Sequence, residues 1–266
     1  MQTEKVADYI VDWLKIYAKN AGVKGFVLGI SGGVDSAVVS TLCARTGMDV
    51  LCLELPILQT STEVSRAKEQ LDFLTSNFPN VSRKEVDLTP VFFAFTQALP
   101  KEGTQQALDL TLANTRSRLR MTALYFFAGI HRLLVAGTGN KIEDFGVGFF
   151  TKYGDGGVDI SPIGDLLKSE VYLLAKTLQV PTSILEAIPT DGLFGDNRTD
   201  EDQLGATYNE LEWAMKMKEE GKSAANFSGR EKVVFEIYDR LNTLNKHKID
   251  PIPVCTIPKE LRNHQH

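Results

Sequence analysis

Short apolar runs alternate with stretches of helical spacing along most of the chain. Apolar runs at residues 25–30, 49–55 and 133–138 have the length of buried strands, and a more polar run at 81–87 predicts a strand at the edge of the sheet. Around these runs, apolar side chains recur every three or four residues. This spacing predicts helices at residues 3–20, 37–45, 61–77, 122–131, 208–218 and 229–245.

The alternation predicts the fold class, which is α/β with a doubly wound, mostly parallel sheet and helices on both faces. Residues 90–113 predict a short helix, a turn and the start of a longer helix, with Phe92, Phe93 and Phe95 interpreted as core residues. An acidic, glycine-rich loop at residues 189–202 is either disordered or a lid over a ligand site.

Composition narrows the class of protein. The 266 residues have room for one large domain, and 43% hydrophobic with 24% charged residues is ordinary for a globular protein. No apolar run approaches the roughly 20 residues that cross a bilayer, and the first residues lack a secretory signal. We therefore expect a cytoplasmic protein without a membrane partner.

The net charge of −5 argues against nucleic acid as a partner. Cys43, Cys52 and Cys255 lack the spacing of metal ligands and are interpreted as unpaired, with the first two buried.

A glycine-rich turn follows the first apolar run, where residues 31–36 read Ser-Gly-Gly-Val-Asp-Ser. Glycines let successive N–H groups face one concavity at the start of the next helix, which makes an anion cradle. The common triphosphate loop has a lysine after its last glycine, whereas here Val34 follows Gly33. Asp35 beside such a cradle predicts Mg²⁺ between its carboxylate and phosphate oxygens, with a helix cap as the structural alternative.

A second glycine-rich segment lies at residues 148–162. It places Lys152, Tyr153, Asp155 and Asp159 among four glycines. Glycines at this density indicate that the backbone closely approaches a ligand, and a tight turn with aspartate caps is the alternative.

These strings together carry a family resemblance. The first loop resembles the pyrophosphate-binding loop of the ATP pyrophosphatase superfamily, whose members split ATP between the α- and β-phosphates to adenylate a substrate. The chain also contains Arg-x-Arg-Met at 118–121, Gly-Thr-x-Asn-Lys-x-Glu at 137–143 and Gly-x-Phe-Thr-Lys-Tyr-Gly-Asp-Gly at 148–156. In this order the strings resemble the ammonia-dependent NAD synthetase family. The resemblance implies a Rossmann-like, adenine nucleotide alpha hydrolase-like fold, in one domain over residues 1–266 without a glutaminase domain.

The resemblance also implies the roles of particular residues. The residues expected to bind ATP are Gly29, Ile30, Ser31, Gly32, Gly33, Val34, Asp35, Ser36, Thr138, Lys168 and Thr190. The residues expected to bind deamido-NAD are Arg118, Lys152, Asp159, His247 and Lys248. Asp35 and Glu143 are expected to hold Mg²⁺, and Asp35 and Lys168 to be catalytic.

Two departures from the family pattern leave questions open. The segment after Glu143 is one residue longer than in many relatives, which makes Asp144 a second candidate for the metal ligand. Glu54 stands where relatives often have a basic residue near the adenine, so the adenine contacts on that side stay open.

The activity that the resemblance implies is the amidation of deamido-NAD to NAD with free ammonia and ATP. The carboxylate would attack the α-phosphate of ATP with loss of pyrophosphate, and ammonia would then displace AMP. Three alternatives remain, namely the same amidation of nicotinate mononucleotide, a tRNA-modifying pyrophosphatase and a nucleotide-binding module without catalysis. The resemblance further implies a homodimer, with helices 3–20 and 122–131 as interface candidates.

Overall fold

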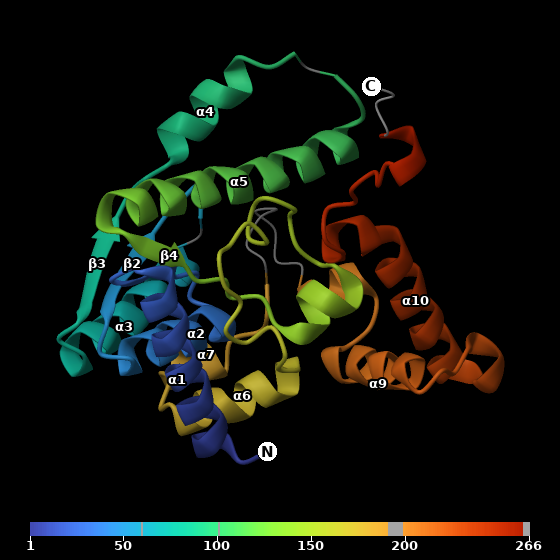
Figure 1. Cartoon of the computed structure of the whole chain (residues 1–266), viewed down its shortest axis with the longest axis horizontal. Coiled ribbons are helices and arrows are strands. Elements are labelled where there is room, and N and C mark those ends of the chain that lie inside the picture. Colours follow the sequence, from blue (N-terminus) through green and yellow to red (C-terminus); the bar gives the residue numbers. More distant parts are fainter. Residues whose placement is uncertain (60, 101, 191–198, 263–266) are drawn as a thin grey trace.

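The computed structural model describes every residue except 60, 101, 191–198 and 263–266, and it contains a parallel sheet of four strands, seen at the left of Figure 1. The order across the sheet is β3-β2-β1-β4, and all three pairings are parallel. The predicted fold class is confirmed, as is the edge position of the polar third strand. The strands are β1 (Gly25–Gly29), β2 (Asp49–Glu54), β3 (Val81–Glu85) and β4 (Leu133–Val135).

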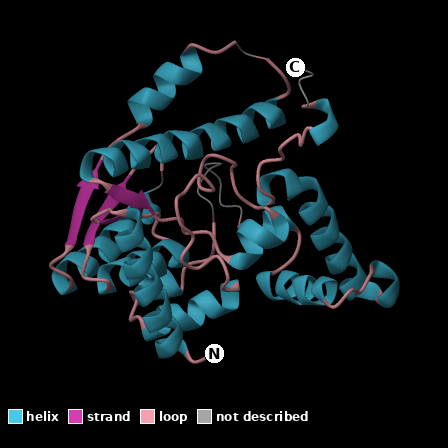
Figure 2. Ribbon diagram, viewed as in Figure 1, coloured by secondary structure: helices cyan, strands magenta, loops and turns pink. Residues whose placement is uncertain are grey.

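Helices cover both faces of this sheet (Figure 2). Along β1, Phe26 and Leu28 face one core while Val27 faces the other, because side chains alternate across a strand. The first face packs against α1 (Thr3–Ala21), α2 (Val34–Arg45), α3 (Ser61–Asn77), α6 (Lys168–Thr177) and α7 (Thr182–Leu185). The second face packs against α4 (Thr89–Gln97) and α5 (Gln105–His131).

Helix α5 differs from its prediction. The structure has one continuous helix from Gln105 to His131, where the sequence indicated the start of a longer helix within residues 90–113 and an apolar helix at 122–131. Arg132 ends it in the left-handed conformation at φ 59°. The interpretation of the phenylalanine cluster holds for Phe92, which is buried, and is wrong for Phe93 and Phe95, which are 46% and 44% exposed.

A third core joins the remaining elements beside the sheet. In this core the short π-helix η1 (Lys141–Val147) packs against α9 (Tyr208–Glu219) and α10 (Gly229–Ile249). The buried residues include Ile142 of η1, Leu211 of α9 and Tyr238 of α10. A π-helix is wider than an α-helix, and nothing in the local pattern predicted it. The other elements are α8 (Asp200–Leu204), η2 (Ala224–Asn226) and η3 (Lys259–Leu261).

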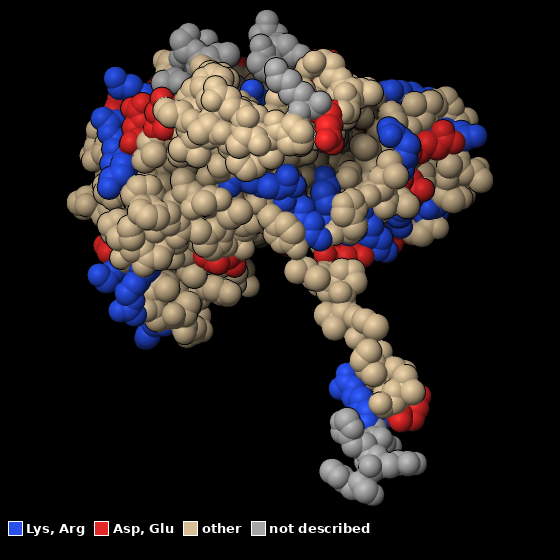
Figure 3. All heavy atoms as spheres, turned by 90° about the horizontal axis from the view of Figure 1, so that it is seen from above, with Lys and Arg blue, Asp and Glu red and all other residues tan. Residues whose placement is uncertain are grey.

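The residues after α10 reach away from the body of the molecule (Figure 3). Ile252 and Val254 in this tail are 65% and 82% exposed. Among the described helices, none combines the length and the apolar character needed to cross a membrane. Cys43 and Cys52 are buried and free, and Cys255 is exposed and free.

Candidate active site

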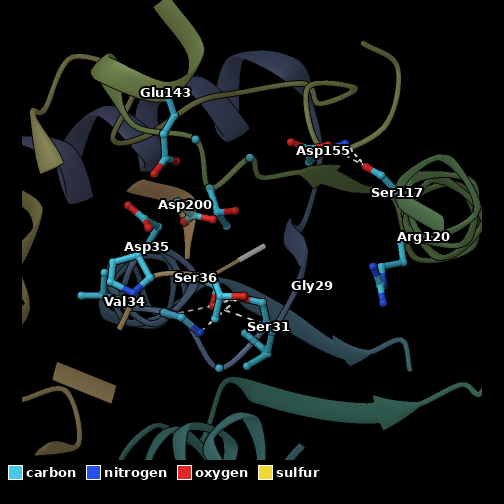
Figure 4. Close-up of a pocket in the computed structure, with 18 of the residues that line it drawn as sticks. Gly29, Ser31, Val34, Asp35, Ser36, Ser117, Arg120, Glu143, Asp155 and Asp200 are labelled. Atoms are coloured by element: carbon cyan, nitrogen blue, oxygen red, sulfur yellow. Dashed lines mark hydrogen bonds between the residues drawn. The ribbon is translucent and has the colours of Figure 1, made fainter. Parts of the chain in front are cut away.

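A cavity of about 300 Å³ opens where the strands β1, β2 and β4 end. Parallel sheets place their ligands at this carboxyl edge, because the loops that follow the strands converge there. The loop after β1, the segment after β4 and the start of α6 all contribute to the walls (Figure 4). Every residue predicted to bind ATP or Mg²⁺ lines this cavity.

The loop between β1 and α2 is held by its own serines. The Ser31 and Ser36 hydroxyls lie 3.0 Å apart, and Ser36 Oγ also donates to the Gly33 carbonyl at 3.0 Å. Gly32 adopts φ +80°, a left-handed conformation that favours glycine. Among the described residues, no side chain caps the N-terminus of α2, so its first N–H groups remain available to an anion.

Three charged side chains, of which Lys168 is buried and two carboxylates are partly buried, form a cluster at one side of the cavity. Lys168 Nζ lies 2.5 Å from Asp35 Oδ2 and 2.9 Å from Glu143 Oε1. Lys168 is the first residue of α6, where the helix dipole disfavours a cation, so the two carboxylates are what hold it there. Asp35 therefore does not act as the cap of α2, which was the structural alternative.

The cluster fixes its own protonation states. Burial alone would lower the pKa of Lys168, but the facing carboxylates of Asp35 and Glu143 outweigh burial and raise this pKa well above its ordinary value. For Glu143, burial raises the pKa, but Lys168 and the Tyr208 hydroxyl more than offset it, so that the net shift is downward. Both shifts favour the charged forms of Lys168 and Glu143, which is the state that their ion pair requires.

Neighbouring polar groups orient the two carboxylates. Asn140 is fully buried, and its Nδ2 donates to Asp35 Oδ1 at 3.1 Å while its Oδ1 accepts from the N–H groups of Ile142 and Glu143. Tyr208 donates its hydroxyl to Glu143 Oε1 at 2.6 Å. The sequence analysis predicted no role for Asn140 or Tyr208. Asn140 does lie within the Gly-Thr-x-Asn-Lys-x-Glu motif at residues 137–143.

The segment that contains Glu143 folds as the π-helix η1. The π-helix begins at the Asn140 cap and ends at Gly148, whose φ is +65°. Glu143 lies at Lys168, whereas Asp144 packs against Gly139, where an added Cβ would stand 1.9 Å from its carboxylate. Of these two acids, Glu143 is thus the one that shares a cation with Asp35.

The far side of the cavity is lined by a second hydrogen-bonded group. Ser117 of α5 donates to Asp155 Oδ1 at 2.6 Å and accepts from the Asp155 N–H at 2.8 Å. The Asp155 carboxylate also accepts from the Thr151 N–H at 3.0 Å. Burial raises the pKa of Asp155 in spite of these bonds. The close packing explains the glycines of this segment, since a Cβ at Gly154 would lie 2.2 Å from Ser117 Oγ.

The predicted lid is described only at its ends. Residues 191–198 lie outside the described residues. The Asp200 N–H donates to the Pro189 carbonyl at 3.1 Å, and Pro189, Thr190 and Asp200 all line the cavity. The lid role of residues 189–202 stays a prediction.

The five residues predicted to bind deamido-NAD do not line this cavity. Four of them form a cluster beside it, where Arg118 Nε donates to the Lys152 carbonyl at 3.3 Å and Lys152 Nζ donates to the His247 carbonyl. Lys248 Nζ donates to the Phe150 carbonyl at 2.7 Å.

Asp159, the fifth residue, lies apart from this cluster. Its carboxylate accepts from the Tyr125 hydroxyl at 3.0 Å and from the Val135 N–H at 2.8 Å, so it holds β4 to α5. The substrate role of all five residues stays a prediction.

Comparisons with known proteins agree with this geometry. Residues 6–251 match the family model described as NAD synthase. The chain is 39% identical to an NH(3)-dependent NAD(+) synthetase of Syntrophomonas wolfei, over 99% of this chain and 100% of the relative.

Two solved structures are also similar to the whole chain. The structure of an NMN synthetase from Francisella tularensis has a TM-score of 0.82 and 31% identity, and covers 97% of this chain and 100% of its own. The structure of an NH3-dependent NAD synthetase from Campylobacter jejuni has a TM-score of 0.76 and 26% identity, with coverage of 96% and 100%.

Proposed function

Because the chain belongs to the NAD synthase family, we propose that it converts deamido-NAD to NAD with ammonia and ATP. The enzyme is thus a ligase that forms a C–N bond. The observation that carries the proposal is the cavity itself, where an anion-binding loop without a lysine faces the cluster of Asp35, Glu143 and Lys168. A free carboxylate is a poor electrophile, so amide formation requires this activation by ATP.

We propose that the reaction proceeds through an adenylate. The carboxylate oxygen of the substrate attacks the α-phosphorus, the bond to the bridging oxygen breaks, and pyrophosphate leaves. Ammonia then attacks the acyl carbon, AMP leaves and one proton is released. The N–H groups at the start of α2 and the Lys168 ammonium stabilise the charge that develops on the phosphates. No protein nucleophile takes part.

The residues at this site fit Mg²⁺. Asp35 and Glu143 offer two carboxylates, each 15% exposed, that already share one cation, and oxygen donors are the ligands that Mg²⁺ prefers. Because Mg²⁺ commonly combines one or two carboxylates with phosphate oxygens and water, two acids are sufficient. Bound there, Mg²⁺ would neutralise phosphate charge. We expect a chelator to stop pyrophosphate release and added Mg²⁺ to restore it, without a change in helix content.

A second candidate function is the amidation of nicotinate mononucleotide. Two observations favour it, namely the similarity to a solved NMN synthetase and the position of the predicted dinucleotide contacts outside the cavity. The phosphate loop and the acid cluster serve both reactions equally. The two candidates therefore differ only in what binds beyond the nicotinate ribose phosphate.

We also propose a homodimer. Of the two helices predicted as interface candidates, 3–20 and 122–131, the proposal uses the second, which lies within α5, together with α4, which packs against α5. Phe93 and Phe95 of α4 and Phe126 and Ile130 of α5 are all more than 40% exposed. Large exposed apolar side chains gathered on neighbouring helices are typical of a protein interface. Light scattering should give twice the chain mass, and Phe126→Glu should reduce the dimer fraction. A wild-type monomer at micromolar concentration would contradict the proposal.

The decisive experiment measures pyrophosphate release with deamido-NAD and with nicotinate mononucleotide, each with ammonium or glutamine. We expect turnover with ammonium, and the preferred acid identifies the function. Asp35→Asn should abolish turnover, whereas Asp165→Asn, which alters an acid whose side chain is 97% exposed, should not. Absence of turnover with both acids would refute the assignment.

A further inference from the structure

Arg66 of α3 lies against the phosphate loop. Its Nε donates to the Gly32 carbonyl at 3.3 Å, and its side chain is partly buried and lines the cavity. The contact joins residues 34 positions apart in the sequence, so it depends on how α3 packs against α2. The family strings in the sequence do not include this arginine.

The loop lacks a cation of its own, since Val34 stands where the common triphosphate loop has lysine. Among the described residues, the basic side chains that line the cavity are those of Arg66, Arg120 and Lys168. Lys168 is held between two carboxylates, and Arg120 Nε donates to the Leu55 carbonyl just beyond β2. Arg66 is bonded to the loop itself and is therefore placed to balance the charge of whatever the loop binds.

The guanidinium of Arg66 retains donors for a ligand. Its bond to Gly32 uses Nε, and within the described part of the chain neither Nη group has a hydrogen bond or an ion pair. Two Nη groups in a fixed planar fork match two phosphate oxygens, which a single ammonium cannot do. The left-handed Gly32 presents its carbonyl to Nε, so the loop orients the fork that would bind its ligand.

We propose that Arg66 binds the β- and γ-phosphates of ATP and holds the pyrophosphate as it leaves. The inference rests on the proposed function and adds one residue to it. When the bond between the α-phosphorus and the bridging oxygen breaks, negative charge moves onto the β-phosphate. Arg66 stabilises that charge without gaining or losing a proton. AMP, which keeps only the α-phosphate, makes no contact with Arg66.

The test compares binding of pyrophosphate and of AMP to purified protein by calorimetry in the presence of Mg²⁺. Arg66→Gln keeps an N–H donor for the Gly32 carbonyl and removes the charge. We expect it to weaken pyrophosphate binding by about 10- to 100-fold, the range of a charged hydrogen bond, and to leave AMP binding within about twofold. Arg66→Lys keeps the charge without the planar fork, so its affinity for pyrophosphate should lie between those of the wild type and Arg66→Gln.

Arg83→Gln is the matched control, because Arg83 pairs with Asp72 on the surface and should change neither affinity. Equal loss of pyrophosphate and AMP in Arg66→Gln would show that Arg66 only shapes the loop, and would overturn the inference. Unchanged pyrophosphate binding, or a wild-type protein that does not bind pyrophosphate, would overturn it as well. If Arg66→Gln does not fold, Arg66→Lys, which loses the planar fork, should still weaken pyrophosphate binding more than AMP binding, and an equal change in both would overturn the inference. Because these affinities require no acid substrate, they report on Arg66 even if the amidation assay fails.

Discussion

Replacing Lys168 by methionine removes the one charge that lies between Asp35 and Glu143. The methionine side chain has similar length and fits the same space without a polar head. In the wild-type protein the Lys168 side chain is only 5% exposed, and the two carboxylates are each 15% exposed. The substitution therefore leaves two carboxylates close together in a region that water reaches poorly.

The expected loss is large for one substitution. Breaking a buried ion pair by removing one partner costs about 3–5 kcal/mol, because the remaining charge keeps its desolvation penalty. The entropy of unfolding at the midpoint is about 2.1 cal/mol/K per residue, which gives roughly 0.56 kcal/mol/K for a chain of 266 residues. The Lys168→Met variant should thus melt about 5–9 °C below the wild type.

Scanning calorimetry of the metal-free protein measures this difference. Lys218→Met is the control, because Lys218 also pairs with an aspartate, Asp239, but the two side chains are 37% and 51% exposed. An exposed pair contributes about 1 kcal/mol or less, so this control should melt within about 2 °C of the wild type. If Lys168→Met melts at the same temperature as the control variant, the ion pairs of Lys168 with Asp35 and Glu143 do not stabilise the fold more than an exposed pair does.

Two further predictions concern the elements around the site. Gly148→Ala should lower the free energy of unfolding by about 2 kcal/mol or more, because φ is +65° and the new Cβ would lie 2.4 Å from Asn245 Cβ. Gly47→Ala is the control, since Gly47 has a similar φ of +73° but open space around it, and it should cost only about 1 kcal/mol. Chemical denaturation measures both variants. Glu210→Gln tests pH dependence, because the hydrogen bond from Arg230 lowers the pKa of Glu210 from 4.5 to about 2. This pair stabilises the fold above pH 4.5 and loses its effect as the pH falls towards 2, so the variant should melt below the wild type at pH 7 and together with it at pH 2. An equal difference at both pH values would contradict the linkage.

The strands were predictable because their signals are local. β1 and β2 are short apolar runs that are followed closely by glycine or proline. A parallel strand that is buried on both faces is typically such a continuous apolar run, so the pattern could be recognised directly. Helix α5 was harder, since Phe126 and Ile130 on its outer surface blur the distinction between a buried face and an exposed one. Apolar periodicity predicts a helix on the assumption that its apolar side chains are buried within the same chain. It fails where apolar side chains such as these stay exposed.

The site was predictable in part for a related reason. Motif residues such as Asp35 and Glu143 lie on the cavity as expected, and the resemblance added Lys168. Arg66 has no such signal, because a charged residue on an amphipathic helix usually faces solvent. Its place at the loop follows from the packing of α3 on α2, which neither helix encodes alone.

Both ends of η1 are held by asparagine side chains. Asn140 anchors the first turn through Asp35, and Asn242 and Asn245 of α10 donate to the carbonyls of Gly146 and Val147 at the last. A π turn encloses one residue more than an α turn, so the gain or loss of one residue changes the width of the turn. We therefore expect a one-residue insertion or deletion to be tolerated in η1, although this segment carries a carboxylate of the site.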